Sequence, residues 1–282
     1  MFPTPIEKAP RSWQLGYQGL LPVMLVAWLL PLIAVAMFSI KPDVDFTNGD
    51  YWGVPSRFAG FENYGKVFFE SDMPRYLMNS VLITVPTVIG AVALSCMTGF
   101  ALGIYRFRSN LWIFFMFVAG NFVPFQILMV PVRDLTLDLG LYNTKLGLVL
   151  FHVAFQTGFC TLFMRNFIRA LPFELIEAAR VEGVAEWRIF WYVVLPLMKP
   201  AIAALAVLIF TFIWNDYFWA VVLTQGAESQ PVTAGITSFN AQYRAAYHLM
   251  SAGSIVAALP PVAMFFLMQK HFIAGLTLGA VK

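Results

Sequence analysis

Six long apolar runs, separated by polar segments, are the feature that most constrains the fold of this chain. Each run holds about 20 residues or more, the length of helix that crosses the hydrocarbon core of a bilayer. The runs cover residues 17–40, 76–105, 111–132, 146–167, 201–224 and 250–272. A segment in lipid must satisfy its own backbone hydrogen bonds, as an α-helix does. The sequence therefore predicts an all-α, polytopic membrane protein with about six transmembrane helices.

The overall composition favours the same class. The mean hydropathy is +0.73 and 12% of the residues are charged, whereas a soluble domain carries roughly 25% charged residues. The formal net charge of +3 is small and spread along the chain, so no nucleic-acid-binding surface is predicted. Little of the chain is left over for a folded soluble domain.

Two features inside the runs qualify this prediction. Ala34-Val35-Ala36 resembles the cleavage site of a signal peptide, but the first run is longer than the roughly 7–15 apolar residues of a signal peptide. We therefore expect a retained span. Prolines inside the spans indicate kinks, which are tolerated where neighbouring helices pack around the break. They are Pro86, Pro124, Pro260 and Pro261.

The distribution of basic residues predicts the orientation. If both termini lie in the cytoplasm, eleven of the 18 Lys and Arg residues fall on the cytoplasmic side and seven on the outer side. This bias is the one that the positive-inside rule describes. The predicted organisation is a cytoplasmic segment 1–16, a six-helix permease domain 17–272 with an internal loop 171–200 inside the cell, and a cytoplasmic tail 273–282.

The loop 171–200 is unusually polar for its surroundings. It holds four of the 15 acidic residues, Glu174, Glu177, Glu182 and Glu186. Pro172 suits the first position of a helix, and Gly183 can end that helix in a left-handed conformation. We expect a helix over residues 172–182.

One face of this helix is predicted to receive a partner protein. Ala179 and Gly183 are four residues apart and share a face, with Phe173 and Ile176 nearby, so a second protein could approach closely. The alternative is a helix that lies flat on the lipid headgroups. Four acids against two arginines, Arg180 and Arg188, would be repelled by an anionic leaflet, which favours the protein partner.

The same loop carries a recognisable pattern. Glu177-Ala178-Ala179, Gly183 four residues on, and Val193-x-Leu195-Pro196 resemble the EAA signature of ABC importer permeases. Three further stretches make the chain similar to the MalG-type permeases of carbohydrate importers. These are Asn79-Ser80, Trp214-Asn215-Asp216-Tyr217 and residues 269–282. The resemblance extends over nearly the whole chain and implies the type I permease fold of ABC importers.

The resemblance also implies a mechanism. In the family, this loop forms a coupling helix that sits in a cleft of a separate ATPase subunit, and ATP-driven closure of two ATPases switches the pore between inward- and outward-facing states. Glu177 would pair with a basic residue of the ATPase, and Gly183 would permit the turn. Ala280, Val281 and Lys282 would reach between the ATPases. One departure is that Val184-Ala185 replaces the usual Ala-Ser, so the next helix must be capped differently or must start at a different residue.

Polar residues within the spans are candidates for a substrate pathway. Asp216 is the only acid so placed; the alternative is a carboxylate bonded to neighbouring helix ends in a cluster with Asn215. The other candidates have a second interpretation too, as satisfied structural residues. They are Asn121, Gln126, His152 and Gln156.

No catalytic or cofactor-binding constellation is predicted. Residues 60–66 match most of the phosphate-binding pattern G-x-x-x-x-G-K-[ST], but Val67 stands where the magnesium-binding hydroxyl belongs. The three histidines are scattered and no Cys/His metal spacing occurs. We expect no enzyme activity, no metal and no cofactor in this chain, with ATP and magnesium bound by the partner ATPase.

The leading functional hypothesis is one permease subunit of an ATP-driven importer of a sugar or sugar derivative in the bacterial inner membrane. Its partners would be a homologous second permease in a heterodimer, two ATPase subunits, an extracytoplasmic solute-binding protein, the carbohydrate and membrane lipid. An ion-coupled secondary transporter is the alternative, which one intramembrane acid and no evident inverted repeat disfavour. A non-transporting membrane scaffold is a third class.

Overall fold

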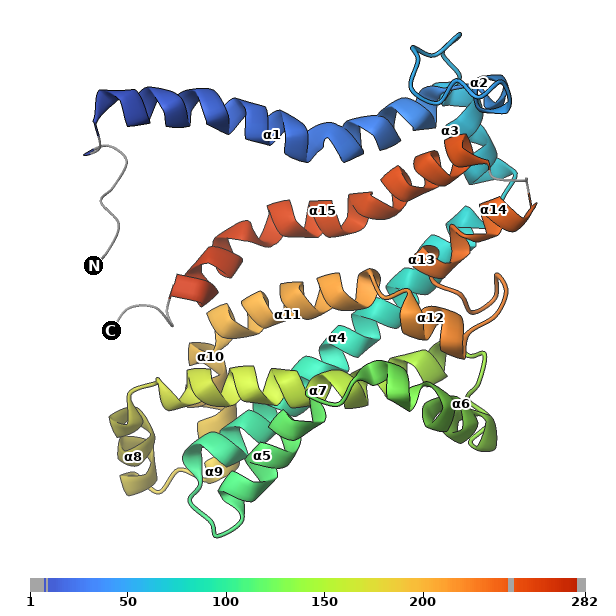
Figure 1. The fold of residues 1–282 in the computed structure, drawn as a ribbon. Coiled ribbons are helices and arrows are strands. Elements are labelled where there is room, and N and C mark those ends of the chain that lie inside the picture. Colours follow the sequence, from blue (N-terminus) through green and yellow to red (C-terminus); the bar gives the residue numbers. More distant parts are fainter. Residues whose placement is uncertain (1–7, 9, 243–245, 278–282) are drawn as a thin grey trace. The chain divides into compact units, whose positions relative to one another are not determined.

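The computed structural model describes residues 8, 10–242 and 246–277 (Figure 1). In this part of the chain every regular element is a helix, so the all-α prediction is confirmed. Four helices are long and apolar enough to cross a membrane, and two bent helix pairs bring the number to six. The four are α1 (Arg11–Ile40), α4 (Met73–Ile104), α7 (Lys145–Arg169) and α15 (Tyr247–Thr277). The bent pairs are α5 (Asn110–Gly120) with Phe125–Asp138, and Glu186–Leu197 with α11 (Lys199–Trp214).

Two of the predicted spans are interrupted in the structure. The run 111–132 is interrupted after α5, and the next helical segment is turned by 88°. Pro124 lies in this break, where its missing N–H and fixed φ end a helix. The run 201–224 is interrupted after Trp214, before α12 (Phe218–Leu223), and α11 itself follows a 73° bend. By contrast, the helices around Pro86, Pro260 and Pro261 continue past these prolines.

The remaining helices are short. They are α2 (Asp43–Thr47), α3 (Gly60–Phe69), η2 (Phe125–Leu128), α6 (Met129–Asp138), α8 (Phe173–Val181), α9 (Glu186–Ile189), η3 (Phe190–Val194), α10 (Leu195–Leu197), α13 (Val232–Gly235) and α14 (Ser238–Gln242). The chain divides into two compact units, Met1–Ser71 with Phe239–Val256, and Asp72–Ser238 with Ala257–Lys282.

In the first unit, the predicted polar connection after α1 is a folded structure. The Lys41 side chain is fully buried, and its ammonium donates to the carbonyl oxygens of Asp50 (2.6 Å) and Tyr51 (3.2 Å). The Asn63 amide of α3 donates to the carbonyls of Ser39 and Lys41 at 2.9 and 2.8 Å. These bonds satisfy carbonyl groups at the end of α1 that have no partner within the helix.

The second unit is built on the crossing of α4 and α7. Gly99 and Gly103 of α4 lie against α7, and a Cβ atom at Gly99 would come within 2.9 Å of Met164 Cβ and 3.0 Å of the Arg165 backbone nitrogen. Glycines spaced by four residues let two membrane helices approach this closely. A hydrogen bond of 2.7 Å between the hydroxyls of Thr98 and Thr161 joins the same helices.

Different elements lie at the two ends of α7 (Figure 1). At one end, α7 leads into α8, which packs against α9. At the other end, α6 and α12 pack together, and α12 also contacts α7. The polar loop 171–200 therefore lies at one end of α7. The helix breaks after α5 and after Trp214 lie at the other end.

Candidate functional site

Helix α8 matches the helix that the loop sequence predicts. It covers Phe173–Val181, with Pro172 as the residue before its first turn. Gly183 has a φ of +74°. The Gly183 N–H donates to the Arg180 carbonyl and the Val184 N–H donates to the Ala179 carbonyl, both at 3.0 Å. This pair of bonds is the Schellman motif, so the left-handed helix end at Gly183 is confirmed.

The predicted small-residue face of α8 is free only in part: Phe173 and Gly183 are exposed, but Ile176 and Ala179 are turned towards the protein itself. Ile176 is 2% exposed and belongs to the main core, and Ala179 packs against that core. Ile176 lies on the same side of the helix as Ala179, three residues on, and burial of the larger side chain turns both inward. The exposed residues of α8 are Phe173, Glu174, Leu175, Glu177, Ala178 and Val181. Val181 is 89% exposed.

A charged network fixes α8 to the elements around it. Arg180 donates from Nε to one Glu186 carboxylate oxygen at 2.7 Å and from a terminal nitrogen to the other at 3.2 Å. The Tyr105 hydroxyl, at the end of α4, also donates to Glu186, at 2.8 Å. The Glu186 carboxylate raises the pKa of Arg180. Ala185 precedes α9 without a side-chain cap.

The end of the motif lies at a helix irregularity. Residues Phe190–Val194 form a π-helical turn in which the Leu195 N–H donates to the Phe190 carbonyl, five residues back. Leu195 packs against the core and Pro196 is exposed. Pro196 has no N–H to continue the α-helical ladder, which suits a wider turn directly before it. The 73° bend into α11 follows.

Two of the five polar span candidates meet at the break after α11. The His152 Nε2 lies 3.4 Å from an Asp216 carboxylate oxygen, with 3% of the His152 side chain and 17% of the Asp216 side chain exposed. The carboxylate also accepts the backbone N–H groups of Trp219 and Ala220 at 3.4 and 3.1 Å. Asp216 therefore caps the N-terminus of α12, as in its structural interpretation.

The other three candidates are more dispersed. Asn121 and Gln126 are exposed beside the break after α5, and Gln156 is half-buried on α7, one turn beyond His152. The rings of Phe125 and Phe218, 5.1 Å apart, bring the two breaks together. Across the described chain, no hydrogen bond joins these three to each other or to His152 and Asp216.

The Trp-Asn-Asp stretch has a structural role that the sequence analysis missed. The Trp214 indole N–H donates to the Ala257 carbonyl of α15 at 2.9 Å. In an α-helix that carbonyl would accept the N–H of the residue four positions on, which is Pro261 and has none. Trp214 therefore replaces the bond that Pro261 cannot make, as neighbouring helices do around membrane prolines.

The Asn79-Ser80 pair also serves a structural role. The Asn79 amide donates to the Ala227 and Gln230 carbonyls, both at 2.9 Å. The Ser80 hydroxyl accepts the Val232 N–H at 2.8 Å. Both side chains hold the connection between α12 and α13 against α4.

Two further expectations concern the C-terminal tail and metal binding. Ala280, Val281 and Lys282 lie outside the described residues. Among the residues that the structure describes, no group of three or more His, Cys, Asp or Glu side chains has an arrangement that could hold a metal ion.

Residues 91–277 match the family described as binding-protein-dependent transport system inner membrane component. The osmoprotective compounds uptake permease protein GgtD of Synechocystis is 33% identical, over 90% of this chain and 88% of that protein. The arabinooligosaccharides transport system permease protein AraQ of Halalkalibacterium halodurans is 31% identical, over 90% of this chain and 91% of that protein.

A solved structure shows the same fold. It is the crystal structure of a bacterial ABC transporter involved in the import of the acidic polysaccharide alginate, with a TM-score of 0.81 at 23% identity over 95% of this chain and 100% of that chain. The predicted ABC importer permease fold is confirmed. With two thirds of its length in the family match and full-length relatives above 30% identity, this chain belongs to the inner membrane components of binding-protein-dependent transport systems.

Proposed function

We propose that this chain is one permease subunit of an ATP-driven importer that takes a sugar or sugar derivative from a solute-binding protein. Family membership supports the dependence on a binding protein. The names of relatives support the solute class, since AraQ is named for arabinooligosaccharides. In this proposal the chain has no catalytic site, and ATP and magnesium bind to separate ATPase subunits. A homologous second permease completes the pathway, and both termini lie in the cytoplasm.

The observation that carries the coupling role is the two-sided character of α8. Its inner side is fixed by Ile176 in the core and by the Arg180–Glu186 ion pair. On its outer side, Glu177 and Val181 are exposed, and no ion pair engages Glu177 within the described chain. A helix mounted this way transmits a push to α4 and α7 rather than bending locally, because tightly packed interiors move as units.

The solute path in this proposal passes the two helix breaks. Interrupted membrane helices expose backbone polar groups that can line a cavity, and here the breaks lie beside the His152–Asp216 pair. The aromatic rings of Phe125 and Phe218 adjoin them. Aromatic faces next to hydrogen-bonding groups suit a carbohydrate.

The test of coupling reverses the charge on the exposed face of α8. Glu177→Lys is expected to reduce co-purification of the ATPase subunits and to abolish binding-protein-dependent uptake, while leaving the thermal stability of the permease unchanged because Glu177 is exposed. Gly183→Asp should also reduce ATPase association and uptake, but it should lower thermal stability as well, because a side chain is strained at the left-handed φ of +74°. Asp134→Lys, on α6 at the other end of α7, is the matched control. Normal ATPase association and uptake in Glu177→Lys would refute the coupling role of α8.

A further inference from the structure

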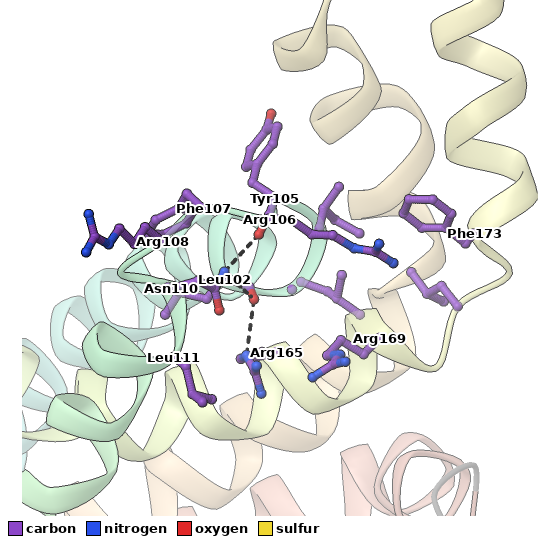
Figure 2. A pocket seen from close by; sticks show the side chains of 14 residues that line it. Leu102, Tyr105, Arg106, Phe107, Arg108, Asn110, Leu111, Arg165, Arg169 and Phe173 are labelled. Carbon is purple, nitrogen blue, oxygen red and sulfur yellow. Dashed lines mark hydrogen bonds between the residues drawn. The ribbon is translucent and has the colours of Figure 1, made fainter.

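A second polar feature lies beside α8 and belongs to none of the motifs above. A cavity of about 640 Å³ opens where α4 ends, α5 begins and α7 leads into α8 (Figure 2). All the charged residues in its lining are arginines, namely Arg106, Arg108, Arg165 and Arg169. We refer to it as the arginine cavity. A lining with four positive charges and no carboxylate selects for an anion.

Arg165 is the buried member of this group. It is 7% exposed, its Nε donates to the Leu102 carbonyl at 3.1 Å, and its guanidinium lies 3.9 Å from the centre of the Phe114 ring. Its terminal nitrogens have no protein acceptor within the described chain. Buried charges in proteins are normally paired, so Arg165 supplies unused donors at the floor of the cavity.

The other arginines add charge that is equally uncompensated. None of the four takes part in an ion pair with a described carboxylate. Arg165 and Arg169 are four residues apart on α7, where like charges repel. Figure 2 shows these two on the same helix, with Arg106 across the cavity and Arg108 directed away from the other three. A bound anion would relieve this repulsion.

The surroundings of the cavity indicate where the anion comes from. The cavity lies at the ends of the spans α4 and α7 and at the start of α5, which is the level of the lipid headgroups. The adjoining surface of α5 is apolar and exposed, with Leu111 at 55%, Trp112 at 76%, Phe115 at 52% and Met116 at 74%. A tryptophan at the end of a span is typical of the membrane interface.

We propose that the arginine cavity binds the phosphodiester headgroup of an anionic phospholipid whose acyl chains lie along α5. Arginine is the side chain best suited to a phosphate, because its planar fork donates two parallel hydrogen bonds. Basic pockets between membrane helices recognise anionic headgroups in this way. An acidic protein segment would also satisfy the charges, but it would not use the exposed apolar surface of α5. The inference requires only that the chain is an inner membrane component, so it does not depend on the sugar or on the ATPase.

The test measures lipid binding to the full chain, purified in neutral detergent with any partners that accompany it. Native mass spectrometry is used to titrate phosphatidylglycerol, phosphatidylcholine and inorganic phosphate. Wild type should bind phosphatidylglycerol in preference to phosphatidylcholine, and more weakly as salt increases. The double variant Arg106→Gln/Arg169→Gln should lose about 25-fold in affinity, from roughly fivefold for each arginine.

Measurements of thermal stability and two further variants distinguish a loss of lipid binding from a loss of folding. Arg106 and Arg169 are exposed, so their replacement should leave thermal stability unchanged. Arg188→Gln, on α9 outside the cavity, is the matched control and should bind phosphatidylglycerol as wild type does. Trp112→Ala should weaken the binding of the lipid without changing that of inorganic phosphate.

Three results would overturn the proposal. The first is equal binding of phosphatidylglycerol to wild type and to the double variant. The second is displacement of the lipid by inorganic phosphate at equal concentration, which would make the ligand a free anion. The third is displacement of the lipid by a purified ATPase subunit, which would make the cavity a protein-docking surface.

Discussion

The bond between Trp214 and α15 gives the sharpest test of how this fold tolerates its prolines. The Trp214 side chain is almost fully buried, and its indole N–H is the donor for the Ala257 carbonyl. Trp214→Phe removes that donor, and Pro261 has no N–H to replace it. A buried carbonyl left without a partner costs about 1–3 kcal/mol. Loss of the larger ring adds a packing cost of similar size.

A double-mutant cycle separates the two costs. Pro261→Ala restores an N–H four residues beyond Ala257, so in that background the carbonyl has its helical partner. Trp214→Phe should then cost about 1–2 kcal/mol less than it does in wild type, because only the packing term is left. The measurement is the free energy of unfolding in mixed micelles. Unfolding is monitored by the reaction of a thiol reagent with Cys96 and Cys160, which are buried and become accessible when the chain unfolds.

This cycle has two controls. Pro260→Ala restores an N–H that donates to the Val256 carbonyl and not to the Ala257 carbonyl, so it should not reduce the cost of Trp214→Phe. Trp112→Phe alters an indole that is 76% exposed and should change the free energy of unfolding little. A coupling energy of zero between Trp214 and Pro261 would refute the idea that the indole replaces the missing bond. Equal rescue by Pro260→Ala would refute it as well.

Three further predictions concern other local structures. A Cβ atom added at Gly183 has no atom within 4 Å, so Gly183→Ala should destabilise the α8–α9 turn only through its left-handed backbone, by about 1–2 kcal/mol. The measurement is hydrogen exchange over residues 173–189, which should be faster than in wild type. Wild-type exchange there would contradict this, and Gly183→Asn should exchange more slowly than the alanine variant. Asp216→Ala should cost about 1 kcal/mol and speed exchange in α12, whereas Asp216→Asn keeps the cap; equal effects of the two would contradict the capping role. The bonds that Glu62 accepts from Lys66 and Arg57 lower its pKa from 4.5 to about 2, so they stabilise α3 above pH 4.5 and this stabilisation is lost as the pH falls towards 2. The thermal midpoint of wild type should therefore decrease more over that range than that of Glu62→Gln, and parallel curves would contradict it.

Much of the fold could be predicted because local composition determines which segments can span the membrane. Residues in lipid must be apolar and helical over a fixed length, so runs such as 76–105 and 146–167 correspond closely to α4 and α7. The break at Pro124 had a local signal. The break after Trp214 had a weaker one, since Asn215 and Asp216 compete for backbone groups, and the apolar run concealed it.

The candidate site was predictable only in part. Glycine and proline set backbone conformation by themselves, so α8 and its end at Gly183 followed from the sequence. The face that α8 exposes did not, because Ile176 and Phe173 are both apolar and only the neighbouring helices decide which is buried. The Tyr105–Glu186 bond joins residues 81 positions apart, a separation at which spacing carries no signal.

The sequence by itself determined the class of protein, the long unbroken helices and the turn at Gly183, since each depends on hydrophobic length or on the conformational limits of a few residues. Only the tertiary structure decided which side of α8 is free, why Trp214 lies opposite a proline, and that arginines from the ends of α4 and α7 line one cavity. These features depend on groups far apart in the chain, whose energies arise only when packing brings them within contact distance.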